Sequence, residues 1–102
     1  MIQTLEVLYV GRRCLEAARE IEARGGVVRP AAHVYEGIAK LRREAVGAVL
    51  VDFEELEPDP GRAIATLRES AGSRPLFVAM TPEAWEVARA RGVIEHGEAI
   101  LR

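Results

Sequence analysis

The chain has little of what marks several common protein classes. It holds a single cysteine, Cys14, so neither an internal disulfide nor a cysteine-ligated zinc site can form within it. No apolar run approaches membrane-spanning length, and residues 1–6 lack the basic start and apolar core of a signal peptide. We therefore expect a cytoplasmic protein that makes no direct contact with a membrane.

The chain also lacks an excess of charge of either sign. Acidic and basic side chains nearly balance, at 16 and 14, which leaves a net charge of −2 and no general attraction to nucleic acid. The two histidines, His33 and His96, lie in unrelated segments, so a metal centre built on them is not expected. With 102 residues and no repeats or linkers, residues 1–102 should form one domain.

What the chain does contain is a regular alternation of apolar runs and amphipathic segments. Residues 7–10 predict a buried strand. Residues 13–24 predict a helix, because their apolar side chains follow the i, i+3, i+4, i+7 spacing: Cys14, Ala17, Ala18 and Ile21. We expect Gly25 and Gly26 to end this helix. A short second strand follows at 27–28, where we expect Pro30 to end it.

The same alternation continues to the end of the chain. A second helix carries its apolar stripe on Val34, Ile38, Leu41 and Ala45. A third strand, 48–51, is closed by Asp52, and an acidic loop spans 53–61. A third helix with Ala63, Ile64, Leu67 and Ala71 inside leads to a fourth strand at 75–80. Thr81 should cap a fourth helix that ends at Gly92, and 99–101 predict a short fifth strand.

This order of elements predicts a parallel sheet covered by helices on both faces. We expect a flavodoxin-like three-layer α/β sandwich with strand order 2-1-3-4-5, four helices and no last helix. In such a sheet, ligand chemistry lies at the carboxyl ends of the first and third strands. Those ends are 10–12, with sequence Val-Gly-Arg, and Val51-Asp52.

On these residues the chain resembles a response-regulator receiver domain, the CheY-like family of two-component and phosphorelay signalling. Asp52 stands where the family's phospho-accepting aspartate ends the third strand. The loop through Asp59 and Gly61 resembles the family's Asp-Gly-containing loop, and Thr81 lies near the position of its switch Ser or Thr. The resemblance covers nearly the whole chain and implies a signalling module.

The departures from the family's pattern concern the same site. Receivers carry an acidic pair after the first strand that binds magnesium together with the phospho-acceptor, and here those positions are Gly11 and Arg12. They also carry a lysine at the end of the fifth strand, for which the nearest candidate is Arg102. The family's final helix has no counterpart.

These departures predict that the normal switch is lost. Magnesium needs several oxygen ligands, and Asp52, even with Glu54 or Glu55, is a poor cage. The guanidinium of Arg12 could instead pair with Asp52 as a fixed surrogate cation, because arginine makes forked hydrogen bonds to carboxylates. We interpret the chain as a degenerate receiver, a pseudo-receiver without catalytic activity or cofactor.

Other interpretations stay open at this point. Asp52 could be a strand-end aspartate that caps the next turn, or the phospho-acceptor of a divergent active receiver that binds Mg²⁺. Trp85 is either an exposed anchor for a partner or a residue that packs on the sheet. A less favoured possibility is a small phosphate-handling enzyme that uses the loop after the first strand. In that case Cys14 lies too late to be the nucleophile and fits better as a core residue.

The lack of a counterpart to the family's last helix predicts that the chain acts through contacts with another protein. Without that helix, one face of the sheet is uncovered near the fourth and fifth strands, and apolar surface of this kind is usually covered by another protein. We expect a partner protein or a second copy of the chain, most simply in a two-fold homodimer.

Overall fold

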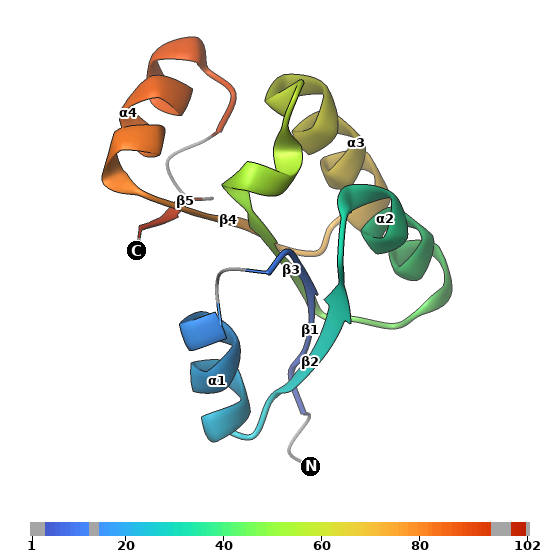
Figure 1. The fold of residues 1–102 in the computed structure, drawn as a ribbon. Coiled ribbons are helices and arrows are strands. Elements are labelled where there is room, and N and C mark those ends of the chain that lie inside the picture. Colours follow the sequence, from blue (N-terminus) through green and yellow to red (C-terminus); the bar gives the residue numbers. More distant parts are fainter. Residues whose placement is uncertain (1–3, 13–14, 95–98, 102) are drawn as a thin grey trace.

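The computed structural model describes residues 4–12, 15–94 and 99–101. Within these residues strands and helices alternate along the chain (Figure 1). The elements are β1 (Glu6–Val10), α1 (Leu15–Ala23), β2 (Val27–Ala31), α2 (Val34–Arg43), β3 (Ala48–Asp52), the 3₁₀ helix η1 (Phe53–Leu56), α3 (Pro60–Ala71), β4 (Leu76–Met80), α4 (Pro82–Arg91) and β5 (Ala99–Leu101).

The five strands form one parallel sheet in the order β2-β1-β3-β4-β5. Helix α1 packs on one face, while α2, α3 and α4 pack on the other (Figure 1). The predicted flavodoxin-like sandwich, with its strand order and four helices, is therefore confirmed.

The central strand β3 shows why this chain folds as a parallel layered sheet. All five of its residues are buried, as expected for a strand covered by helices on both faces. Val49 and Val51 face the cluster formed with α2, α3 and α4, and Ala48 and Leu50 face the cluster on the α1 side. Asp52 follows at the carboxyl end, so the buried strand carries a charged residue to the rim of the sheet.

The second strand is longer than the sequence predicted. We expected Pro30 to end it, but β2 runs through Pro30 to Ala31, so that prediction was wrong. β2 is an edge strand, and proline is tolerated there where its main chain faces away from the sheet. The carbonyl of Ala31 points inward and accepts a hydrogen bond from the Gly11 amide (3.0 Å), so that of its neighbour Pro30 points outward.

Most other boundaries differ from the sequence prediction by one or two residues, and two differences concern whole segments. α2 ends at Arg43, so Ala45 lies outside the helix and is exposed rather than part of its apolar stripe. The segment expected as a loop over 53–61 begins with η1, whose Leu56 is 1% exposed and fixes this segment to the core.

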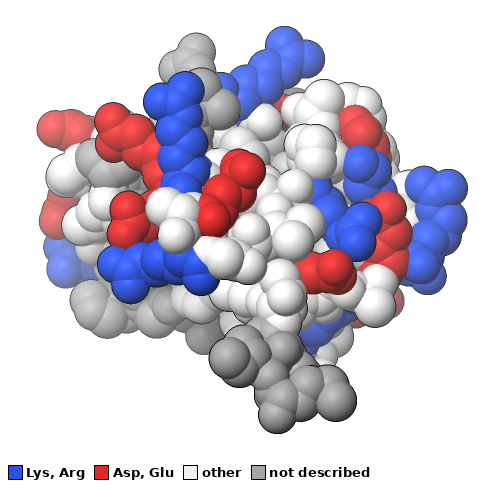
Figure 2. Space-filling view, turned by 90° about the horizontal axis from the view of Figure 1, so that it is seen from below, with Lys and Arg blue, Asp and Glu red and all other residues white. Residues whose placement is uncertain are grey.

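The surface agrees with the mixed charge of the sequence. On the face shown in Figure 2, acidic and basic side chains are interspersed around an uncharged centre, with no large area of one sign. No helix in the described part of the chain combines the length and the apolar character that crossing a membrane requires.

Candidate functional site

Asp52 is the buried charged residue at the carboxyl end of the sheet. It is the last residue of β3 and is 1% exposed, and no other charged side chain of the described residues is as fully buried. β3 lies between β1 and β4, and all three strands are parallel. The turn after β1 and the first residues after β4 are therefore at the same edge of the sheet as Asp52. A carboxylate in such a position requires hydrogen-bond donors, because burying a charge without partners is costly.

Two donors reach the same oxygen of Asp52. The hydroxyl of Tyr9 donates to Oδ2 over 2.8 Å, and the main-chain amide of Arg12 donates to it over 3.1 Å. Tyr9 is itself 4% exposed, so this contact is sealed from solvent. The carboxylate is thus directed towards the turn after β1.

Gly11 allows this close approach. Its φ of 141° is one that residues with a side chain rarely adopt. A Cβ placed on it would lie 2.7 Å from Cγ of Asp52 and 2.8 Å from its Cβ, well inside van der Waals contact. Asp52 therefore packs against the bare backbone of Gly11, in space that a Cβ at position 11 would need.

Arg12 meets Asp52 differently from the sequence hypothesis. Its side chain is exposed, and between these two described residues the contact runs through the Arg12 amide, with no ion pair from the guanidinium. The forked ion pair that we expected is not formed, because the turn after β1 presents the main chain of Arg12, and not its side chain, to the carboxylate.

The described residues do not fit a magnesium ion at this rim. The two positions after β1 at which the sequence comparison expected acidic side chains hold Gly11 and Arg12. No group of three His, Cys, Asp or Glu side chains suited to a metal ion occurs in the described ranges. Glu54 and Glu55, expected as possible helpers of Asp52, lie on η1 and line a separate cavity described below.

Thr81 and Trp85 both belong to α4. Thr81 is the N-cap, and its hydroxyl accepts a hydrogen bond from the Ala84 amide over 3.2 Å, which confirms the predicted helix start. Trp85 is 8% exposed and lies in the core cluster with Met80 and Ile94. The exposed-anchor interpretation of Trp85 is therefore wrong, because α4 turns the indole towards the sheet.

Three residues named in the sequence interpretation lie outside the described residues. They are Cys14, His96 and Arg102, and the predicted helix over 13–24 also begins outside the described ranges.

A cavity of about 700 Å³ lies between α2 and α3, and we call it the α2–α3 groove. Its walls are the start of α2, the segment from η1 to the start of α3, and the first turns of α3. It is lined by His33, Val34, Tyr35, Ile38, Glu54, Glu55, Leu56, Glu57, Pro58, Asp59, Arg62, Ala63 and Thr66. Asp52 is not among these residues, so the groove and the buried carboxylate are separate features.

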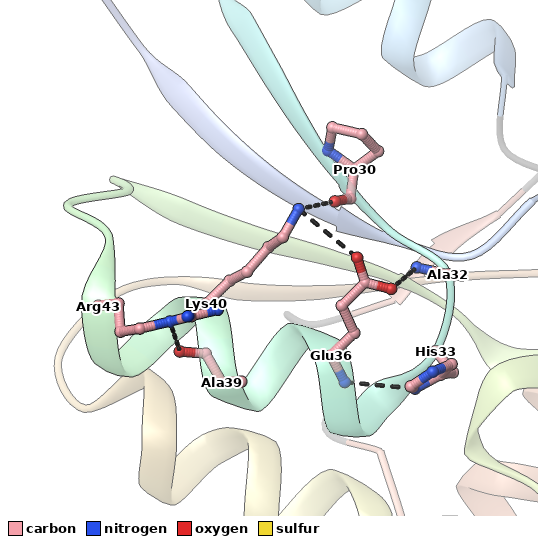
Figure 3. Close-up of polar contacts among 7 residues, drawn as sticks. All are labelled: Pro30, Ala32, His33, Glu36, Ala39, Lys40 and Arg43. Atoms are coloured by element: carbon pink, nitrogen blue, oxygen red, sulfur yellow. Dashed lines mark hydrogen bonds and ion pairs between the residues drawn. The ribbon is translucent and has the colours of Figure 1, made fainter.

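The start of α2, which forms one wall of the groove, is held by reciprocal hydrogen bonds (Figure 3). Nδ1 of His33 accepts from the Glu36 amide over 3.2 Å, and Glu36 in turn accepts from the Ala32 amide over 3.0 Å. Lys40 donates to the outward carbonyl of Pro30 over 2.6 Å and pairs with Glu36 at 3.6 Å. These contacts resemble a capping box, with histidine in place of Ser or Thr.

Glu36 should make stability depend on pH. The hydrogen bond from Ala32, helped by the charge of Lys40, lowers the pKa of the Glu36 carboxyl below its ordinary value of 4.5. Its contribution to stability is therefore complete above that value and is lost as the pH falls through the lower pKa of the folded state. We expect Glu36→Gln to lower the urea midpoint at neutral pH, and the difference from the wild type to vanish in acid. A difference that is equal at both pH values would contradict this account.

Two features of these sites went unrecognised in the sequence. Tyr9 was assigned only to a buried strand, although a polar hydroxyl in an otherwise apolar strand is a sign that it has a hydrogen-bond partner. Tyr9 pairs with Leu50, two residues before Asp52, so the two polar side chains lie on the same face of adjacent strands. The α2–α3 groove left no comparable signal, because its walls come from segments whose relative placement is set by the packing of two helices.

Comparison with known proteins supports the fold. No protein-family model and no curated protein sequence matches the chain. Among solved structures, the chain is similar to the chemotaxis response regulator CheY4 of Vibrio cholerae. The TM-score is 0.65 at 17% sequence identity, over 88% of this chain and 82% of that one. Together with the strand order, this similarity shows that the chain has the fold of a CheY-like receiver domain.

Proposed function

We propose that this chain is a receiver-like signalling module that acts through contacts with other proteins, without catalytic activity of its own. In this proposal Asp52 has become a structural carboxylate and is no longer phosphorylated in a magnesium-dependent way. The proposal combines the receiver fold with the altered geometry at the carboxyl end of the sheet.

The observation that carries the proposal is the closed environment of Asp52. The carboxylate is 1% exposed, accepts hydrogen bonds from Tyr9 and Arg12, and packs against Gly11. Phosphoryl transfer to a carboxylate needs access for the donor and a cation to offset the charge of the transferred group. The first requirement conflicts with a side chain that is 1% exposed, and for the second the described residues offer no group of three acidic, His or Cys side chains that could hold a metal ion.

Apolar surface on the sheet supports action through protein contacts. In the described chain α1 is the helix that covers its face of the sheet, and it contacts β2 at one side. On the same face Phe77 of β4 is only partly buried, and Ile100 of β5 is 38% exposed. We propose that another protein or a second copy of the chain covers this area.

Incubation with acetyl phosphate and Mg²⁺ tests the proposal. We expect the intact mass to stay unchanged, because Asp52 is enclosed and the described residues form no acidic cage for the metal. Mg²⁺ with beryllofluoride should likewise leave the fluorescence of Trp85 unchanged, whereas an active response regulator treated in parallel should respond in both assays.

Asp52→Asn is the control for this experiment. A mass increase of one phosphoryl group in the wild type that is absent in Asp52→Asn would overturn the proposal. It would favour instead the divergent active receiver that is phosphorylated on Asp52.

A further inference from the structure

We propose that the α2–α3 groove binds a short basic segment of a partner protein, in which Lys or Arg residues flank an aliphatic or aromatic side chain. This inference builds on the proposed function, because it assigns a contact surface to a module that acts through other proteins. It does not depend on the state of Asp52, which lies outside the groove.

The charge of the groove selects a basic partner. Four carboxylates line it, from Glu54, Glu55, Glu57 and Asp59, against the single guanidinium of Arg62. Asp59 is already used, since it caps α3 by accepting a hydrogen bond from the Arg62 amide over 3.2 Å. The carboxylates of Glu55 and Glu57 make no ion pair or hydrogen bond within the described chain, so they can pair with incoming cations.

The floor of the groove gives the segment a place for an apolar side chain. Leu56 is 1% exposed at its base, and Val34 and Ile38 are only partly buried against the core. Tyr35 stands at the mouth with 82% of its surface exposed, the largest exposure of any large apolar or aromatic side chain described. An aromatic ring beside a partly apolar groove is a typical anchor in protein interfaces.

The wall that carries Tyr35 is already ordered. The rings of His33 and Tyr35 meet edge to face, with centroids 6.4 Å apart, and His33 is held by its bond to the Glu36 amide (Figure 3). Because the start of α2 is fixed on both sides of Tyr35, binding would cost little loss of backbone freedom. The groove therefore combines a fixed wall, an apolar floor and an acidic rim.

Selection from a phage-displayed library of short random peptides tests the inference. We expect the enriched peptides to be basic and to share an aliphatic or aromatic position. Their affinity should fall about three- to tenfold for Glu55→Gln/Glu57→Gln, as for two ion pairs near the surface, and about tenfold for Tyr35→Ala. Backbone chemical shifts should change at the groove when a selected peptide is added.

Matched control variants distinguish binding at the α2–α3 groove from a general effect of surface charge and from any effect of Asp52. Glu16→Gln/Glu22→Gln removes two exposed acids from α1 and should leave binding unchanged, as should Asp52→Asn. Sedimentation of the same variants reports whether the groove is instead filled by a second copy. If Glu55→Gln/Glu57→Gln or Tyr35→Ala dissociates a dimer, the occupant is the chain itself and the inference is wrong.

Other outcomes are equally clear. Selection of neutral or acidic peptides, failure to enrich any, or binding that is insensitive to the groove variants would also overturn the inference. Phosphorylation of Asp52 in the acetyl phosphate assay would overturn the proposed pseudo-receiver function but leave the groove result standing, so the two failures can be told apart.

Discussion

Replacing Gly11 with alanine is expected to lower the free energy of unfolding by about 3 kcal/mol. Two effects add at this position. The φ of 141° is strained for a residue with a side chain, and the new Cβ would lie 2.7 Å from Cγ of Asp52. To relieve the contact, either the turn after β1 or the buried carboxylate must move, and the Tyr9 and Arg12 hydrogen bonds would be disturbed. Urea unfolding followed by far-UV circular dichroism measures the loss.

Gly92→Ala is the matched control for this substitution. Gly92 ends α4 in the left-handed region, with φ of 67° and ψ of 22°, but a Cβ there would meet nothing within 4 Å. We expect it to cost about 1 kcal/mol from the backbone conformation alone. Equal losses for the two variants would show that Asp52 does not pack against Gly11 as described.

Tyr9→Phe is expected to lower the free energy of unfolding by about 2 kcal/mol. The substitution keeps the ring in the core but removes the hydroxyl that donates to Asp52 Oδ2 over 2.8 Å. Because the carboxylate is 1% exposed, water cannot readily replace the lost donor. Chemical unfolding measures the effect, and Tyr35→Phe, at a ring that is 82% exposed, should change stability very little.

A double-mutant cycle tests the cause of this loss. In an Asp52→Asn background, Tyr9→Phe should cost about 1 kcal/mol, because a hydrogen bond to a neutral amide is weaker than one to a carboxylate. If Tyr9→Phe costs the same in both backgrounds, the negative charge of Asp52 does not strengthen the hydrogen bond from Tyr9 and this account of the loss is wrong.

The strands and their order could be predicted because they depend on local pattern. The apolar run over 48–51 and its neighbours have the length and composition of buried strands, and right-handed crossovers leave few ways to arrange them. Thr81 was predicted as a cap on similar grounds, since a hydroxyl residue before Pro82 and Glu83 is typical of a helix start. These features need no knowledge of distant contacts.

The details of the site could not be predicted in the same way. Whether Arg12 turns its guanidinium or its amide towards Asp52 depends on the path of one turn, and that path depends on the unusual φ of Gly11. The burial of Trp85 depends on how α4 is rotated on the sheet. Pro30 misled the prediction of β2 because a proline is compatible with a strand only at an edge, and which strand is at the edge is a property of the whole sheet.

Pro30 also has a consequence for the behaviour of the molecule at high concentration. Strand β2 forms one edge of the sheet, and exposed edges can template the addition of strands from other molecules, the first step of aggregation. At Pro30 the outward-facing backbone offers no amide hydrogen, and its carbonyl is already bound by Lys40. An incoming strand would find no amide donor at Pro30 and would have to compete with Lys40 for its carbonyl, so strand addition is disfavoured at this position of the edge.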